Sequence, residues 1–158
     1  MNIDLSSRNI YQLPFDGNID IRPAPFHYKD RRMLYAVDFA LDIGTPLRPS
    51  QNGIVRKVID GYGQGALEME LLDKCNVVIL EHEKGEHSVY AHLRKGILVS
   101  EGQEITVDQL IGYSGLSGFT GYPHLHYETM IRQNGGWLSI PTRFRISDQV
   151  EMLVSPKE

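Results

Sequence analysis

The sequence predicts a mostly β fold, a single domain with antiparallel strands and little helix. Its 158 residues suffice for one domain with its own core. Turn signals rich in Gly, Asn, Asp and Pro recur along the whole chain, and short segments rich in Val, Ile, Leu and Tyr lie between them. Helical character is confined to GALEMELLDK at residues 65–74, where we expect one short helix. Together these observations are typical of a small antiparallel β domain.

We expect residues 1–158 to form one domain whose core extends over about residues 13–144. Residues 1–20 are predicted to be a lead-in with one short strand, and residues 147–158 a polar tail. The strands between them are short, rich in β-branched and aromatic residues, and bounded by turn residues. They are predicted in YAVDFALDIGTP (35–46) before its turn, and at 53–59 (GIVRKVI), 76–81 (NVVILE), 88–93 (SVYAHL) and 124–130 (HLHYETM).

The composition is that of an ordinary globular protein, with 41% hydrophobic and 23% charged residues. The formal net charge is −4 and the pI about 5.8, whereas binding to nucleic-acid phosphates requires a basic face, so we expect no nucleic-acid partner. The N-terminus lacks the pattern of a signal peptide, and no apolar run is long enough for a membrane span. As written, the chain is expected to be cytoplasmic unless it is released or exported without a leader.

Several single residues have ordinary structural interpretations. Cys75 is the lone cysteine, which excludes an intramolecular disulfide, and we expect a small, half-buried side chain. His82 and His87 flank the turn EKGE and are expected to be surface or hydrogen-bonding residues. Trp137, in NGGWL, is expected in the core.

The segment GYPHLHYETM carries the clearest chemical signal. Alternate side chains of a strand share a face, so His124, His126 and Glu128 would lie together. The residues between them, Leu125 and Tyr127, would face the core. A strand here therefore presents three groups that can bind a metal or a proton.

The segment SVYAHL is expected to behave in the same way. Ser88, Tyr90 and His92 would share one face, and the apolar residues between them the other. Pairing of the two strands would bring His92 opposite His124 or His126. Zinc bound by these three imidazoles alone is one interpretation of the pattern.

An acidic residue interrupts another predicted strand. Asp38 lies within the apolar run YAVDFA, where an ionised side chain is rare unless it is paired or binds a metal. Asp42 lies beside the turn at Gly44 and is expected to be solvated. Asp38 is therefore the acidic candidate for a metal site.

Four segments, taken in order, resemble the lysostaphin/LytM-type zinc endopeptidases, a family of peptidoglycan hydrolase-like peptidases. They are YAVDFALDIGTPLRPSQNGIV (35–55), NVVILEHEKGEHSVYAHL (76–93), VSEGQEITVDQLIGYSGLSG (99–118) and GYPHLHYE (121–128). The resemblance implies an antiparallel β sandwich with a central groove. It also implies one Zn²⁺ per chain, held by a histidine, an aspartate and the second histidine of a His-x-His pair.

Carried over by position, the resemblance makes Asp38 and His126 metal ligands, and His92 and His124 the catalytic pair. Zinc with two imidazoles and one carboxylate keeps a position open for water. The helix motif His-Glu-x-x-His is absent, so the two catalytic histidines must carry the protons. Glu128 either orients a histidine or is a surface carboxylate.

The third ligand departs from the common family pattern. Leu34 stands where the histidine usually lies, four residues before Asp38. Some members use a histidine further upstream, and His27 fits that variant. We expect His27 and Asp38 on two strands joined by the polar turn KDRR.

The implied reaction is hydrolysis of a peptide bond by a metal-bound water, with peptidoglycan cross-links or stem peptides as the substrate class. Two alternatives come from other classes. A catalytically silent binding or activator module would keep the groove but have lost a ligand, which Leu34 favours. A cupin-like oxygenase also carries His-x-His on strands, but it binds iron and needs a glutamate ligand further along than Glu128. The bond cleaved and the oligomeric state do not follow from the sequence.

Overall fold

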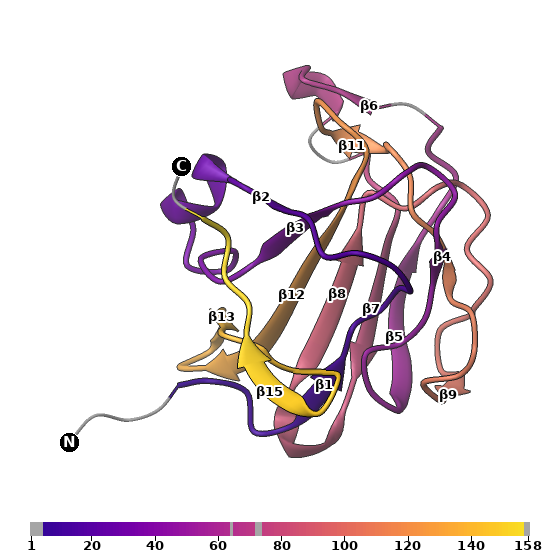
Figure 1. Ribbon diagram of the computed structural model, residues 1–158. Coiled ribbons are helices and arrows are strands. Elements are labelled where there is room, and N and C mark those ends of the chain that lie inside the picture. The colour runs from indigo at the N-terminus through magenta and orange to yellow at the C-terminus, as the bar shows by residue number, and fades with distance from the viewer. Residues whose placement is uncertain (1–4, 64, 72–73, 157–158) are drawn as a thin grey trace.

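A central antiparallel sheet organises the computed structural model, which describes residues 5–63, 65–71 and 74–156 (Figure 1). Its longest strand, β12 (His124–Gln133), contains most of the GYPHLHYETM segment and lies between β3 and β8. The strand order is β2 (Ile21–Arg22), β3 (Val37–Ala40), β12, β8 (His87–Ala91), β7 (Val77–Glu81), β5 (Gly53–Ile59) and β9 (Glu104–Ile105), with β13 (Gly136–Ile140) paired to the far end of β12.

Smaller sheets flank the central one. One contains β1 (Ile10–Gln12), which runs parallel to β14 (Arg143–Ile146), and β15 (Gln149–Met152), which pairs with β14 in the antiparallel sense. Two others are short pairs, β4 (Pro46–Leu47) with β10 (Gly112–Tyr113), and β6 (Gly65–Ala66) with β11 (Gly118–Phe119). Helical structure in the described residues is limited to three short 3₁₀ turns, η1 (Pro25–Lys29), η2 (Met69–Leu71) and η3 (Glu83–Gly85). The predicted fold class, mostly β with antiparallel neighbours and little helix, is confirmed.

The short helix expected at residues 65–74 is wrong. Residues 65–66 form β6, residues 69–71 form η2, and residues 72–73 lie outside the described residues. β6 and β11 approach so closely that a Cβ on Gly65 would lie 1.4 Å from the carbonyl oxygen of Leu116. Leu67 and Met69 are 65% and 72% exposed, whereas Leu71 in η2 is buried.

The two ends of the chain pack beside each other on the sheet. The short strand expected in the lead-in is confirmed as β1. Residues 149–152, in the stretch expected to be a polar tail, form β15. Figure 1 shows β1 and β15 crossing in front of the central sheet.

The core fills the space between β1, β14 and one face of the central sheet. Leu125 and Tyr127 point into it and are fully buried, as the alternation of β12 predicts. The ring of Tyr127 lies 5.3 Å from that of Phe144 on β14. Because these residues occupy one face of β12, the residues between them are directed to the opposite face.

A buried carboxylate fastens the N-terminal segment to the sheet. Glu86, which precedes β8, is 1% exposed. Its Oε2 accepts a hydrogen bond from the backbone N–H of Arg8 at 2.6 Å, and its Oε1 accepts from the backbone N–H of Asn9 at 3.1 Å. The Asn9 side-chain amide and the Tyr11 hydroxyl also donate to Oε1, at 3.0 and 2.9 Å. Four donors therefore converge on one acidic side chain.

Among the described residues, no helix has the length and apolar character that crossing a membrane requires.

Candidate metal centre

Strand pairing places Asp38 directly beside His126. The register of β3 and β12 sets these two residues opposite each other. Asp38 Oδ1 and His126 Nδ1 are 3.3 Å apart, and both side chains are buried. Because paired strands fix both backbones, this half of the site is built into the sheet.

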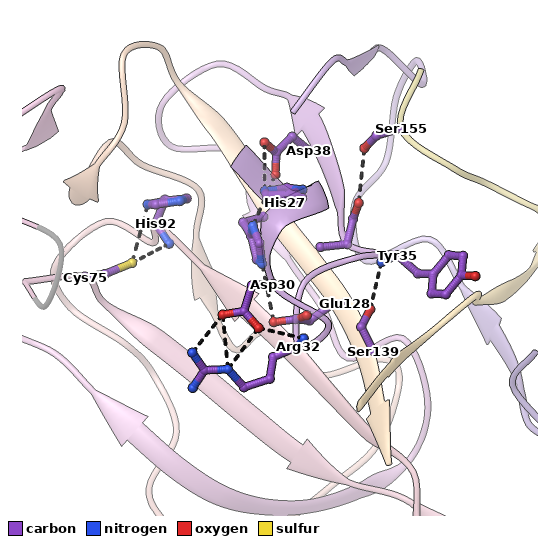
Figure 2. A network of polar contacts seen from close by, with 12 residues as sticks. His27, Asp30, Arg32, Tyr35, Asp38, Cys75, His92, Glu128, Ser139 and Ser155 are labelled. Atoms are coloured by element: carbon purple, nitrogen blue, oxygen red, sulfur yellow. Dashed lines mark hydrogen bonds and ion pairs between the residues drawn. The ribbon is translucent and has the colours of Figure 1, made fainter. Parts of the chain in front are cut away.

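His27 approaches the same point from outside the sheet. Its Nε2 lies 3.6 Å from Asp38 Oδ2 (Figure 2). Its ring lies 4.8 Å from that of His126. The expected pair of strands joined by the turn KDRR is wrong, because His27 lies in η1, and the upstream strand that pairs with β3, β2, ends at Arg22 before His27 is reached. Pro25 begins this tight turn, and its ring fixes a backbone angle suited to such a start.

His27, Asp38 and His126 have the geometry of a metal site. One donor atom from each residue lies within 4.8 Å of the others, and this is the one such group among the residues that the structure describes. Nδ1 of His27 and Oδ1 of Asp38 are buried without a hydrogen-bond partner there. Buried polar atoms of this kind are normally satisfied, and a metal ion beside Asp38 would satisfy its carboxylate. Two imidazoles and one carboxylate also match the donor preference of zinc.

His124 lies on the same face of β12, two residues from His126. Its Nδ1 donates to the carbonyl of Tyr122 at 2.9 Å, and Thr120 Oγ1 lies 3.1 Å away. Its Nε2 therefore carries the lone pair when the ring is neutral, and this atom is 3.6 Å from Asp38 Oδ2. The ring of Tyr122 stacks on that of His124 at 4.5 Å.

His92 joins the cluster for a reason that strand alternation does not give. Tyr90 lies opposite Tyr127 and faces the core, so the expectation that Tyr90 and His92 share the histidine face is wrong. Ala91, which lies opposite His126, is on that face instead. His92 has a φ of +64°, the left-handed region, which interrupts the alternation. Its ring consequently lies 4.6 Å from His124 and 6.0 Å from His126.

Two contacts hold His92 in this conformation. Its Nδ1 donates to the carbonyl of Ser117 at 2.7 Å, and its backbone N–H donates to Cys75 Sγ at 3.1 Å (Figure 2). Cys75 is half-buried, as predicted, but its contact with a histidine was not expected. As in His124, a proton fixed on Nδ1 leaves Nε2 free to accept another.

Electrostatics keep His92 and His124 neutral. Burial, followed by the nearby charges of His124 and His126, lowers the pKa of His92 to about 3. Burial also lowers the pKa of His124, against the opposing effect of Asp38. Both rings are therefore unprotonated near neutral pH and can act as proton acceptors.

The pKa values of His27, Asp38 and His126 are shifted in different directions by burial and by their neighbours. Burial lowers the pKa of His27 to about 4, which favours the neutral form that binds metals. Burial opposes ionisation of Asp38, but the neighbouring ring of His126, whose Nδ1 lies 3.3 Å from Oδ1, outweighs it and lowers the pKa of Asp38 to about 2. Burial likewise opposes a charge on His126, yet Asp38 and Glu128 raise its pKa well above the ordinary value. Without a metal, His126 thus carries a proton that a metal ion would replace.

Glu128 is buried rather than on the surface, at 6% exposure. Its Oε1 lies 3.4 Å from His126 Nε2, whereas Nδ1 of the same ring faces Asp38. Its Oε2 is buried and makes no hydrogen bond to the described residues. This arrangement supports the interpretation in which Glu128 orients a histidine, and the surface interpretation is wrong.

The other candidate residues lie away from this cluster. His82 is a hydrogen-bonding residue, as expected, with Nδ1 2.7 Å from the carbonyl of Asn52 and Nε2 2.7 Å from Ser88 Oγ. His87 packs its ring against Trp137 at 4.8 Å. Trp137 is only half-buried, at the end of the sheet, so its expected place in the core is wrong.

Sequence reasoning missed the loop that supports the histidines. Residues 114–122 (SGLSGFTGY) contribute the carbonyls of Ser117 and Tyr122 and the hydroxyl of Thr120. Backbone carbonyls have no signature in a sequence, so these contacts could not have been found there. Thr120, which is 3% exposed and four residues before His124, is the one side chain that offered a signal.

Comparisons with known proteins agree with this geometry. The chain is 38% identical over 95 residues to the peptidoglycan DD-endopeptidase ShyA of Vibrio cholerae, covering 60% of this chain and 20% of that protein. It is 33% identical over 100 residues to lysostaphin of Staphylococcus simulans, covering 63% and 18%. The crystal structure of a zinc-containing peptidase from Vibrio cholerae has a TM-score of 0.59 at 25% identity, over 83% of this chain and 39% of that one. The chain thus spans about a fifth of the length of these curated relatives.

The family assignment rests on a longer match. The sequence pattern of peptidase family M23 fits residues 32–138, well over half of the chain. That range contains Asp38, His92, His124 and His126, and it begins after His27. Its relatives and structural neighbours are of the lysostaphin/LytM type that the sequence motifs resemble. The chain belongs to peptidase family M23.

Proposed function

We propose that this chain is a zinc-dependent endopeptidase that hydrolyses peptide bonds with a metal-activated water, acting on the peptides of peptidoglycan. The observation that carries the proposal is the meeting of His27, Asp38 and His126 beside two neutral imidazoles, His92 and His124. The relatives are named as endopeptidases, which supports a hydrolase.

His27, Asp38 and His126 are the residues that would hold the ion. A bound zinc ion supplies a Lewis acid and one open position for water. Asp38 and His126 are fixed by paired strands, whereas His27 depends on the segment around η1. Glu128, against the far nitrogen of His126, orients that ring and increases its basicity.

His92 and His124 would carry the protons. Their Nδ1 atoms are engaged with Ser117 and Tyr122, so each presents an unprotonated Nε2. Such a nitrogen can accept a proton from the attacking water and return it to the leaving amine. Once protonated, an imidazole can also donate a hydrogen bond to the carbonyl oxygen as negative charge develops there.

The substrate proposal comes from the relatives. ShyA is a peptidoglycan DD-endopeptidase, and another relative, 32% identical over 132 residues, is the DD-carboxypeptidase/endopeptidase Mpg of Neisseria meningitidis. The common substrate in these names is the peptide part of peptidoglycan. We propose the same class of peptide for this chain.

The test uses purified peptidoglycan. Wild-type protein is incubated with it beside His124→Ala and the control Tyr62→Phe, whose half-exposed ring lies outside the histidine cluster. Released amino groups and fragment masses are measured. We expect cleavage by wild type and control and none by His124→Ala. Equal release by His124→Ala and wild type would contradict the assignment of the proton carrier.

Metal analysis distinguishes the enzyme from a silent module. One equivalent of zinc in the purified protein, lost in His27→Ala and in Asp38→Ala, supports the enzyme. A wild-type protein that binds no zinc and cleaves nothing would favour the silent module that has lost a ligand.

A further inference from the structure

His27 belongs to a segment without strand pairing of its own. Between β2 and β3, the backbone makes a succession of local turns, from His27 N–H to Ala24 O, Met33 N–H to Asp30 O and Ala36 N–H to Met33 O. Segments held only by such bonds are the easiest parts of a fold to open locally. A metal ligand must nevertheless stay within a fraction of an ångström of its position. Something outside this segment, which we call the His27 arm (residues 23–36), must therefore hold it.

Residues after β15 contact the His27 arm at two points, Tyr28 and Ala36. The hydroxyl of Tyr28, next to His27, lies 3.3 Å from the carbonyl oxygens of both Ser155 and Pro156. The hydroxyl of Ser155 donates to the carbonyl of Ala36 at 3.1 Å (Figure 2). Ala36 lies two residues before Asp38. Residues 155–156 thus contact a residue close to each of two proposed metal ligands, His27 and Asp38.

These polar contacts are not part of a close-packed apolar interface. A cavity of about 730 Å³ lies between the His27 arm and the C-terminal segment, lined by Tyr28, Leu34, Tyr35, Val154, Ser155 and Pro156. Val154 is 55% exposed and Tyr28 is 37% exposed. Since apolar packing is sparse here, the hydroxyls of Tyr28 and Ser155 supply a large part of the connection.

The arm also contacts β11, where the ring of Phe119 lies 6.0 Å from that of Phe26, and it is hydrogen-bonded to β13. The backbone N–H of Ser139 donates to the carbonyl of Arg31 at 3.1 Å, and the N–H of Tyr35 donates to Ser139 Oγ at 3.0 Å. These bonds hold Arg31 and Tyr35, whereas the C-terminal segment holds residues 28 and 36, which lie one residue from His27 and two residues from Asp38. Removing the hydroxyls of Tyr28 and Ser155 should therefore leave the fold intact but make the position of His27 less fixed.

We propose that Tyr28 and Ser155 are positioning residues for the metal site, through which residues 155–156 hold the His27 arm in place. This inference rests on the proposed function, since it concerns how tightly the zinc ligand His27 is presented. Both proposed positioning residues, Tyr28 and Ser155, lie outside residues 32–138, the range shared with the family pattern.

The experiment measures zinc affinity by competition with a chromogenic chelator, using the full chain. The double variant Tyr28→Phe/Ser155→Ala removes two hydroxyls and no apolar packing. The matched control Tyr62→Phe/Ser100→Ala removes the same groups from a half-exposed and an exposed residue whose hydroxyls make no contact with the arm. Ser155→Thr retains a hydroxyl and serves as the conservative variant.

We expect the double variant to bind zinc about tenfold more weakly, within the range typical of residues that orient metal ligands. The control and Ser155→Thr should match wild type, and the urea midpoint of the metal-free double variant should be unchanged. Equal affinities of wild type and double variant, with stoichiometric zinc in both, would overturn this inference and leave the proposed function standing. So would a general loss of stability that accounts for the weaker binding. Absence of zinc from the wild type would overturn both proposals.

Discussion

The rings of His92 and His124 lie 4.6 Å apart, and each has its Nδ1 bonded to a carbonyl of the same loop. Ser117 receives one bond and Tyr122 the other, so one short segment sets the proton position on both rings. Both histidines therefore have Nε2 free to accept a proton, although they lie in different segments of the chain.

Replacing either histidine should separate metal binding from catalysis. In His92→Gln or His124→Gln, the rate of peptide hydrolysis is expected to fall by a factor of roughly 100 to 10,000, because a positioned proton acceptor is lost. The zinc content should stay at one per chain, since neither residue belongs to the metal group. Metal analysis beside the rate measurement checks this, and loss of zinc in either variant would show that the pair binds the ion itself.

Replacing Glu128 should weaken zinc binding without removing it. Glu128→Gln keeps the shape but removes the negative charge beside His126 Nε2, so His126 becomes a poorer ligand. We expect zinc affinity to fall by about 10- to 100-fold, measured by chelator competition. The control Glu83→Gln changes an exposed glutamate and should have no effect. An unchanged zinc affinity in Glu128→Gln would mean that the charge of Glu128 does not strengthen zinc binding by His126.

Replacing Glu86 should destabilise the fold and spare the site. The amide of Glu86→Gln can accept at one oxygen only, and its NH₂ group would face backbone N–H donors of residues 8–9. We expect the free energy of unfolding to fall by about 2 kcal/mol, as buried donors lose a charged partner. Urea denaturation measures this, with Glu83→Gln again as control. Zinc affinity should not change, and a parallel loss of zinc would contradict a purely structural role for Glu86.

The stability of the metal-free protein should depend on pH through His82. Burial lowers the pKa of His82, so its folded form stays neutral while the unfolded form takes up a proton below pH about 6.5. The unfolded state then binds more protons, and stability falls as the pH decreases, by up to about 1.4 kcal/mol per pH unit for one group. His82→Gln lacks this contribution.

Denaturation curves in chelator at several pH values between 5 and 7.5 test this point. The difference in unfolding free energy between wild type and His82→Gln should shrink as the solution is acidified. Parallel pH profiles for the two proteins would show that His82 has the same pKa folded and unfolded.

The sequence predicted the strand-borne half of the cluster because strand alternation is a local rule. Leu125 and Tyr127 face the core, and His124, His126 and Glu128 face away from it, as their spacing indicates. The same rule fails for residue 92, since a single left-handed residue reverses the direction of a side chain and leaves no mark in the pattern.

The rest of the site depends on contacts between residues far apart in the chain. His27 could be selected only as the upstream histidine that a family resemblance allows, and its 3₁₀ turn was not foreseen. The contacts of Ser155 with Ala36, and of Ser117 with His92, join segments through backbone carbonyls. Tertiary packing determines such contacts, and the residue types involved do not predict them.

At residue 92, the backbone conformation favours glycine or asparagine, whereas the proposed chemistry requires an imidazole. A non-glycine residue in the left-handed region costs about 1 kcal/mol, and Gly or Asn would adopt it more readily. His92→Gly is therefore expected to relieve conformational strain while abolishing turnover. If His92 carries protons as proposed, only selection for that role opposes the gain in stability that glycine or asparagine would give at this position.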